Sequence, residues 1–462
     1  MKMRLGLRPG GRRVLVAVAV AAVGWACGPP ASTPTAPSNL LLITLDTLRA
    51  DHVGCYGYQR PTTPAIDRFA ATATRFEDVT CSMPTTLPSH WTIFTGLPPA
   101  LHGVTRNGQV PESYPPSIFE LLGRAGARTA AIVSAGVVDA RYVQGLGFSE
   151  VIFDRSGAKV FQVSGQVVTD NALAWLQRHR DERFALWLHY YDPHEPYEPP
   201  GEMAARFTAG YRGDLPQALS TDWLVGLNDP AAEAALSAED RQHVVDLYDA
   251  EVAFLDDRLG RVLAAVSELG LEGSTLVVIV ADHGQAHGER SFWGHGERLL
   301  EPVIKVPLLV HLPGQREGRV VAAAVETLDL MPSLLEWFAL EPIGGLPGRS
   351  LAGAVRGEAI APAERRLVAR RSFPEEPERA GLVIHRVSDK GTFYREPDGE
   401  TFHIGHADGE GGLDGEDFFV AGDVGSAWLP SEVEHYLAAE RAAAAGTSPE
   451  DLEMLRALGY VR

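Results

Sequence analysis

Continuous apolar runs of strand length alternate with helix-like stretches along the chain, and this alternation constrains the fold more than any other sequence feature. Four such runs are Leu40–Leu45, Phe184–Tyr190, Thr275–Ala281 and Lys305–Leu312. The stretches with helical caps or helical spacing are Pro64–Ala73, Ser237–Leu269 and Leu328–Leu340. Strands that are apolar at nearly every position are typical of sheets buried on both faces. The alternation therefore predicts an α/β fold in which helices sandwich a mostly parallel sheet.

Acidic and histidine side chains follow three of these runs. Asp46 comes after the first run, Asp192 and His194 after the second, and Asp282 and His283 after the third. In open parallel sheets, ligands bind at the carboxyl ends of the strands, so we expect these groups to converge. Mixed Asp and His ligands suit Zn²⁺ or Mn²⁺, whereas an all-oxygen set suits Ca²⁺ or Mg²⁺. The sequence predicts a divalent metal site, with Zn²⁺ or Mn²⁺ favoured over Ca²⁺.

Charge and cysteine content exclude several classes of protein. The 462 residues carry a formal net charge of −19, which argues against a nucleic-acid partner, because phosphate backbones require clustered Lys and Arg. The cysteines are Cys27, Cys55 and Cys81, too few for a disulfide scaffold or a four-cysteine zinc site. A disulfide between Cys55 and Cys81 stays open, and the sequence does not predict an oligomeric state.

The N-terminus is typical of an export signal. Residues 1–13 contain five basic residues and no acidic one, and an apolar run, Val14–Ala26, follows. Thirteen helical residues span about 20 Å, too short for a bilayer core of about 30 Å. The run ends at Cys27, in a stretch that resembles a bacterial lipoprotein cleavage site. We expect residues 1–27 to direct export to the periplasm or cell envelope. Three outcomes stay open: lipidation at Cys27, cleavage as an ordinary signal peptide, or retention as an uncleaved anchor. Residues 28–38 are predicted to be a flexible linker, so the membrane would be contacted only through the N-terminus.

The stretch Thr85–Val104, TTLPSHWTIFTGLPPALHGV, resembles the signature of the sulfatase family within the alkaline phosphatase superfamily. That signature is a nucleophile followed by x-Pro-Ser-Arg, a Thr-Gly whose glycine lies ten residues on, and a His-Gly. Counting back from Gly96 places the nucleophile at Thr86. The stretches NLLLITLDTLRADHVGCYGY, HYYDPHEPY and ADHGQAHGE follow in family order, and the resemblance covers roughly residues 39–350.

The resemblance implies the fold and the site. It implies an alkaline-phosphatase/sulfatase-like catalytic domain over residues 39–348 and a smaller C-terminal α+β subdomain over residues 349–462. The implied metal ligands are Asp46, Thr86, Asp282 and His283. A second metal site could be formed by Asp192, His194 and His295, and the sequence leaves one or two metals open.

This chain departs from the family at the nucleophile. Sulfatases convert a Cys or Ser to formylglycine, and Thr86 cannot become that aldehyde. Cys81 is five residues out of register. The family's Arg is replaced by His90, its second metal-binding Asp by Thr47, and its sulfate-contacting Lys by His295. The GK-x-H loop that contacts sulfate in the family reads VSAG over residues 133–136.

A threonine nucleophile resembles the phosphodiesterase and phosphoethanolamine-transferase branches of the superfamily. In nucleotide pyrophosphatase-like relatives an Asn about twenty residues after this threonine binds a phosphoryl oxygen, and Asn107 lies 21 residues after Thr86. Thr86 would attack, Asn107 would stabilise charge on the equatorial oxygens, and His194 or His295 would protonate the leaving oxygen.

These observations predict a metal-dependent hydrolase of phosphate or phosphonate mono- or diesters, acting on a small-molecule, glycan or lipid ester. Three alternatives remain. One is a sulfuric ester hydrolase, which the lost sulfate-contacting loop opposes. The second is a phosphoethanolamine-type transferase, although such relatives usually carry several transmembrane helices and none follows residue 27. The third is a degenerate binding module, against which the joint presence of Asp46, Thr86, Asp282 and His283 argues.

Overall fold

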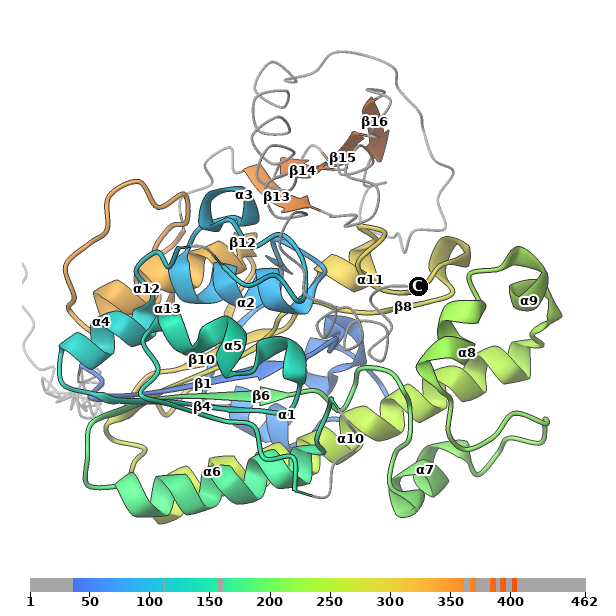
Figure 1. The fold of residues 1–462 in the computed structure, drawn as a ribbon, viewed down its shortest axis with the longest axis horizontal. Coiled ribbons are helices and arrows are strands. Elements are labelled where there is room, and N and C mark those ends of the chain that lie inside the picture. Colours follow the sequence, from blue (N-terminus) through green and yellow to red (C-terminus); the bar gives the residue numbers. More distant parts are fainter. Residues whose placement is uncertain are drawn as a thin grey trace, which may run out of the picture. The chain divides into compact units, whose positions relative to one another are not determined.

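The computed structural model describes residues 36–111, 113–156 and 161–360, and the strands at 366–370, 383–387, 391–395 and 401–404. An eight-stranded sheet with the order β11-β2-β10-β7-β1-β6-β4-β5 forms its centre (Figure 1). The neighbouring strands from β7 to β5 are mutually parallel, and β10 runs antiparallel to both of its neighbours. The predicted α/β fold with a mostly parallel sheet is confirmed.

Three predicted strands lie side by side in the middle of this sheet. They are β1 (Asn39–Leu45), β6 (Phe184–Tyr190) and β7 (Thr275–Ala281), and every residue in them is buried. Leu45 at the end of β1 pairs with Tyr190 on one side and Ala281 on the other. The three strands therefore end level with one another, and the residues that follow them meet at one edge.

The remaining strands of the sheet are short. They are β2 (Thr74–Phe76), β4 (Arg128–Val133), β5 (Glu150–Ile152), β10 (Leu308–His311) and β11 (Arg319–Val321). The predicted strand Lys305–Leu312 is longer than β10, because only Leu308–His311 pair with β7. Small two-residue strands are β3 (Val79–Thr80), β8 (Ala286–His287), β9 (Trp293–Gly294) and β12 (Val325–Glu326).

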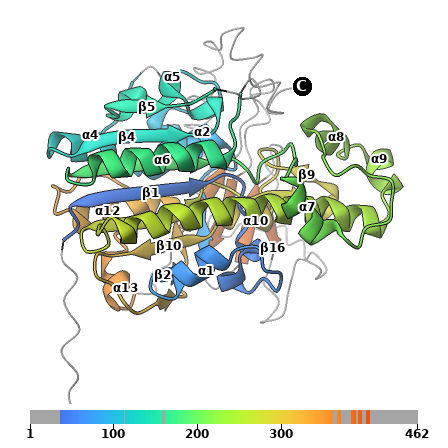
Figure 2. The same ribbon diagram turned by 90° about the horizontal axis from the view of Figure 1, so that it is seen from below.

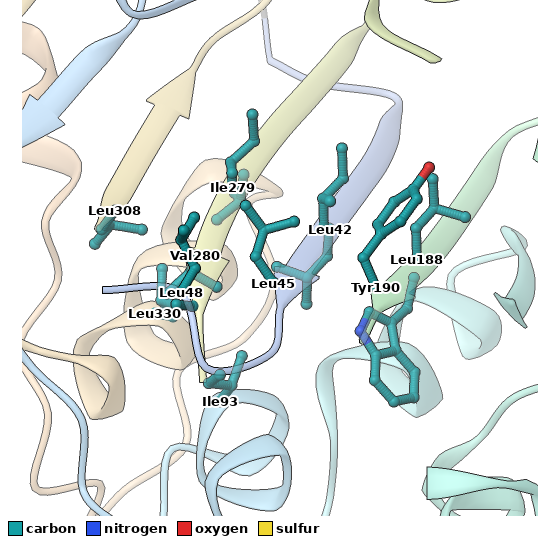
Figure 3. Packing of buried hydrophobic residues seen from close by; sticks show 14 of the residues in the cluster. Leu42, Leu45, Leu48, Ile93, Leu188, Tyr190, Ile279, Val280, Leu308 and Leu330 are labelled. Carbon is teal, nitrogen blue, oxygen red and sulfur yellow. The ribbon is translucent and has the colours of Figure 1, made fainter. Parts of the chain in front are cut away.

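Helices cover both faces of the sheet. Figure 2 shows α6 (Gly165–His179) and α10 (Ala238–Glu268) running side by side across one face. Helix α10 begins where Ser237 and Asp240 form a capping box, as the predicted start at Ser237 requires. On the opposite face lie α2 (Thr86–Thr95), α4 (Ile118–Arg124) and α12 (Leu330–Trp337) (Figure 1). Ile93 of α2 and Leu330 of α12 pack with the strand residues of the core (Figure 3).

The other helices have eight residues or fewer and lie in the connections. They are α1 (Pro64–Ala70), α3 (Pro99–His102), α5 (Ala140–Val143), α7 (Gly201–Thr208), α8 (Thr221–Gly226), α9 (Pro230–Ala235), α11 (Glu301–Ile304) and α13 (Ala352–Arg356). Among the described residues, no helix combines the length and the apolar character needed to span a bilayer. The predicted signal peptide and most of the linker lie outside the described residues.

The predicted C-terminal subdomain is described only in part. Its strands β13 (Arg366–Arg370), β14 (Val383–Val387), β15 (Gly391–Arg395) and β16 (Thr401–Ile404) form an antiparallel sheet in that order. Just after the predicted boundary, the backbone N–H of Arg349 donates to Asp329 and that of Leu351 to Ser333 in α12, both at 2.7 Å. The domain boundary at residue 348 stays a prediction.

Candidate active site

Asp46, Thr86, Asp282 and His283, here called the strand group, meet at the carboxyl ends of β1 and β7. Asp46 directly follows β1, and Asp282 and His283 directly follow β7. Nε2 of His283 lies 3.9 Å from Oδ1 of Asp46 and 3.5 Å from Oδ2 of Asp282. All four side chains are buried. The residues that the sequence predicts as one metal site are therefore gathered in one place.

Thr86 is the first residue of α2, so its hydroxyl stands at the positive end of that helix. Pro88 suits the first helical turn, where a backbone N–H would have no intrahelical partner. The hydroxyl of Ser89 donates to the carbonyl oxygen of Asp282 at 2.7 Å and ties α2 to the end of β7. Oγ1 of Thr86 lies 3.4 Å from Nε2 of His283.

The atoms of the strand group fit a divalent cation. Nδ1 of His283 lies 3.0 Å from the carbonyl oxygen of Gly284, which can only accept, so Nδ1 carries the proton and Nε2 has a lone pair. Oδ1 of Asp46 and Oδ2 of Asp282 are buried without a hydrogen-bond partner in the described structure. Buried carboxylate oxygens without donors are costly, and a cation among them removes that cost. Mixed nitrogen and oxygen donors suit Zn²⁺ or Mn²⁺.

The pKa shifts of these side chains also favour a bound divalent cation. Burial raises the pKa of Asp46 well above its usual value, and Glu195 raises it further. Burial also raises the pKa of Asp282, with Asp46 adding to the effect. The pKa of His283 is lowered by burial, so this imidazole is neutral and can coordinate. A cation bound here would favour both carboxylates in their charged form.

Residues around the strand group fix its geometry. Nε2 of His189 donates to Oδ2 of Asp46 at 3.2 Å. Thr47 has a φ of 53°, in the left-handed region that β-branched residues rarely adopt. That backbone is held at both ends, since the Thr47 N–H donates to Oδ1 of Asp282 and the Tyr248 hydroxyl donates to the Thr47 carbonyl. His90 donates from Nδ1 to the Thr86 carbonyl at 2.7 Å and anchors the start of α2.

Asn107 lies next to the predicted nucleophile. Its Oδ1 accepts from the backbone N–H of Leu87 at 2.8 Å, in the first turn of α2. Its Nδ2 is buried and has no hydrogen-bond partner in the described structure. An unpaired buried donor beside a candidate nucleophile suits an anionic oxygen of a substrate.

His194, Glu195 and His295, here called the loop group, form a second cluster. His194 and Glu195 lie in the loop after β6, and His295 follows β9. One potential ligand atom of each lies within 4.8 Å of the others, and the Nε2 atoms of the two histidines are 3.0 Å apart. The rings of His283 and His295 are 4.4 Å apart between centres, so the two groups adjoin.

Asp192 is not a member of the loop group. Its Oδ1 accepts from the backbone N–H of Gly165 at 2.8 Å, at the start of α6. It lines a pocket of about 290 Å³ together with Glu198 and Glu251. Glu195 stands where the sequence prediction had Asp192, and no sequence signal favoured one acid over the other.

Charges in the loop group are coupled. Burial lowers the pKa of His194 to about 4 and also lowers the pKa of His295. Burial acts to raise the pKa of Glu195, but His194 and His295 outweigh it, so this pKa is lowered. Oε2 of Glu195 also accepts from Nε2 of Gln285 at 2.8 Å. The two imidazoles therefore favour the charged form of Glu195, and Glu195 in turn favours the protonated form of each imidazole.

Cys55 and Cys81 take no part in either group. Cys81 is buried, and both it and Cys55 are free thiols, so the disulfide left open by the sequence is absent from this structure. Burial raises the pKa of the Cys81 thiol. A protonated, buried thiol is a poor nucleophile.

Comparison with known proteins identifies the family. The family model described as Sulfatase matches residues 38–340. The arylsulfatase of Clostridium perfringens is 23% identical over 378 residues, covering 68% of this chain and 77% of that protein. The human N-sulphoglucosamine sulphohydrolase is 29% identical over 355 residues, covering 70% of this chain and 67% of the human protein.

A solved structure shares the fold. The phosphonate monoester hydrolase SpPMH from Silicibacter pomeroyi superposes with a TM-score of 0.65 at 22% identity, covering 88% of this chain and 95% of that chain. The matched family segment takes in β1, α2, β6 and β7, and with them the strand group and the loop group. The chain belongs to the sulfatase family of the alkaline phosphatase superfamily and is a hydrolase of sulfate or phosphate esters.

Proposed function

We propose that this chain hydrolyses phosphate or phosphonate esters, as mono- or diesters, with Thr86 as the nucleophile. The observation that carries the proposal is the threonine hydroxyl itself, buried inside the strand group and 3.4 Å from Nε2 of His283. A threonine cannot be oxidised to the aldehyde that sulfatases use, so its hydroxyl must attack the substrate directly. A direct attack by an alcohol gives a covalent ester intermediate.

The side chains around Thr86 suit an in-line attack at phosphorus. Nδ2 of Asn107 would hold an equatorial oxygen, and the positive end of α2 would favour the anionic group. The cation held by Asp46, Asp282 and His283 would supply a lowered hydroxyl pKa and charge neutralisation when bound. The bond between Oγ1 of Thr86 and phosphorus forms as the bond to the leaving oxygen breaks. Water then hydrolyses the Thr86 ester and frees the hydroxyl.

The loop group would act on the leaving side. His295 adjoins His283, with 4.4 Å between ring centres, so the loop group lies beside the reacting phosphorus. Negative charge that develops on the leaving oxygen would be stabilised there, by a proton from His194 or His295 or by a bound cation.

Sulfate ester hydrolysis is the second candidate. The observation that favours it is the sequence similarity to two curated relatives named as sulfatases. The same hydroxyl would attack sulfur in place of phosphorus. The substrate in either case would be a small-molecule, glycan or lipid ester.

The experiment compares ester classes and Thr86 variants. Purified enzyme with Zn²⁺, Mn²⁺ or Ca²⁺ is assayed on an aryl phosphate, an aryl phosphodiester, an aryl phosphonate and an aryl sulfate. We expect a phosphorus ester to turn over fastest, with Zn²⁺ or Mn²⁺. Thr86→Ala should lose roughly 10³-fold or more in kcat/KM, and Thr86→Ser should keep part of it.

A matched control is Thr95→Ala, because Thr95 closes the same helix with its hydroxyl on the Trp91 carbonyl. This variant should retain nearly full activity. Fastest turnover of the aryl sulfate would favour the second candidate. Full activity in Thr86→Ala would exclude the threonine mechanism for every ester.

We further propose that the chain is exported and lipid-anchored at Cys27. The basic and apolar residues before this cysteine support the proposal. On cell fractionation, the wild-type protein should be in the membrane fraction and Cys27→Ala should be in the soluble periplasmic fraction. Cytosolic protein in both cases would contradict export.

A further inference from the structure

We propose that the pocket lined by Asp192, Glu198 and Glu251, here called the acidic pocket, binds an ammonium group on the alcohol part of the ester. This inference rests on the proposed function and deepens it, because it names the class of alcohol that the enzyme releases. It stands on the place of the pocket, on the charge of its lining and on the buried carboxylate of Glu251.

The acidic pocket adjoins the loop group. It has a volume of about 290 Å³, and its lining comes from the loop after β6, the start of α6 and the middle of α10. His194 is one of the lining residues. Tyr191 is another, and its ring stacks on the His194 ring with 4.2 Å between centres. Because the loop group would act on the leaving side, the alcohol part of the ester would extend toward this pocket.

The lining of the pocket carries negative charge. Asp192, Glu198 and Glu251 contribute carboxyl groups, and the described residues of the lining include no lysine or arginine. Arg258 acts electrostatically on Asp192, but it is outside the lining and its guanidinium is paired with Asp257. A pocket lined by one sign of charge attracts the opposite sign. The acidic pocket therefore favours a cationic substituent and disfavours a second anionic group.

Glu251 is the residue that most requires a cation. It is 6% exposed, and its Oε1 accepts from the backbone N–H of Glu198 at 2.7 Å. Glu251 forms no ion pair with any residue that the structure describes. Burial raises the pKa of Glu251 well above its usual value, and Asp192 raises it further. A buried carboxylate without a counter-charge is costly, and an ammonium group in the pocket would remove that cost.

The spacing of the acids favours an organic cation over a metal ion. In the described part of the chain, two sets of His and acidic side chains bring three ligand atoms within 4.8 Å of one another, and they lie in the strand group and the loop group. Asp192, Glu198 and Glu251 belong to neither set. The pocket has room for an alkylammonium group, and Tyr191 and Phe254 add aromatic surface, which attracts ammonium groups.

The test is the binding of matched alcohols that differ in charge. Choline and 3,3-dimethylbutan-1-ol have nearly the same shape, but only choline is a cation. Ethanolamine and propan-1-ol form a second pair, with a primary ammonium group. Calorimetric titration of the wild-type protein should give a Kd roughly 10-fold lower for the cation in at least one pair. Absence of a preference for the cation in both pairs would overturn the proposal.

Two variants locate the binding site. Glu251→Gln keeps an acceptor for the Glu198 N–H but removes the charge, so most of the preference for the cation should be lost. Gln162→Lys should lose it too, because it places a competing ammonium group in the lining. The matched control, Glu268→Gln, alters an exposed glutamate at the end of the same helix as Glu251 and should keep the preference. Wild-type preference in both pocket variants would overturn the assignment to this pocket.

The same comparison applies to turnover. For the acid group that is cleaved fastest, the choline or ethanolamine ester should have a kcat/KM roughly 10-fold higher than the ester of its neutral partner. Equal values in both pairs would overturn the substrate class. The binding measurements need no turnover, so they can fail while Thr86 still cleaves an ester. They can also succeed if Thr86→Ala disproves the threonine mechanism, and the two proposals are therefore tested separately.

Discussion

The strand group and the loop group adjoin, but different parts of the fold hold them. Asp46 and Asp282 follow two neighbouring parallel strands whose last residues, Leu45 and Ala281, are paired in register. The loop group lies in loops beyond the central sheet, and contacts with backbone carbonyls and with Gln285 help to hold its side chains.

This difference has a chemical consequence. Strand ends place two carboxylates and one imidazole around the hydroxyl of Thr86, an arrangement suited to activating a nucleophile. The loops place two imidazoles and one carboxylate beside it, which suits the leaving side. The attacking group thus lies where the strand ends meet the start of α2, and the loops hold the groups on the leaving side.

The largest loss of activity is expected from a substitution in the strand group. Asp46→Asn removes a charged ligand, and metal chemistry contributes several kcal/mol to the transition state, so kcat/KM should fall by roughly 10³-fold or more. Bound zinc should fall by one equivalent. The matched control, Asp181→Asn, alters a carboxylate whose side chain is 91% exposed and should leave both values unchanged. Near-normal activity in Asp46→Asn would contradict the inference that the strand group activates the nucleophile.

Asn107 tests whether the substrate oxygens are held on the strand-group side. Asn107→Ala removes the unpaired Nδ2 donor, and kcat should fall by roughly 10²-fold. Asn107→Asp keeps an acceptor for the Leu87 N–H but has no donor, so it should be at least as slow. A purely structural role would leave Asn107→Asp active. Steady-state kinetics on the fastest ester separate these outcomes.

Variants of His189 test how strongly metal binding by the strand group depends on the hydrogen bond from His189 to Asp46. His189→Leu removes the N–H that orients Asp46, and Zn²⁺ affinity at the strand group should fall by roughly 10–100-fold. His189→Gln keeps an N–H donor and should recover much of that affinity. Competition with a chromophoric chelator measures the affinity. Unchanged Zn²⁺ affinity in His189→Leu would contradict this role of His189.

Sequence reasoning worked where strands determine position. Continuous apolar runs delimit β1, β6 and β7, so the positions of Asp46 and Asp282 follow from strand ends alone. The start of α10 was predictable because Ser237 and Asp240 are close in sequence and form a local cap. Local patterns and parallel register thus account for the fold and the strand group.

The loop group was less predictable because distant contacts decide it. Asp192 turns to the N–H of Gly165, 27 residues away, and Glu195 turns to Gln285, 90 residues away. Neither contact has a sequence signal, so the choice between these two acids needed the structure. The antiparallel direction of β10 also needed the structure, because it depends on which strand β10 pairs with, here β7.

The smallest expected effect is at Asp192, and it is an effect on the free energy of unfolding. Burial raises the pKa of Asp192 to about 6, so between pH 4 and 6 the folded state binds more protons than the unfolded state. Stability contributed by this group therefore falls as pH rises through that window. Asp192→Asn removes the cost of the buried charge and still accepts from Gly165. Because the side chain is partly open to the pocket, we expect a gain of about 1 kcal/mol at pH 8 and none at pH 4. Urea denaturation at the two pH values measures this, and zinc content should stay at the wild-type value. A loss of bound zinc in Asp192→Asn would show that Asp192 takes part in metal binding and does not only accept from the N–H of Gly165.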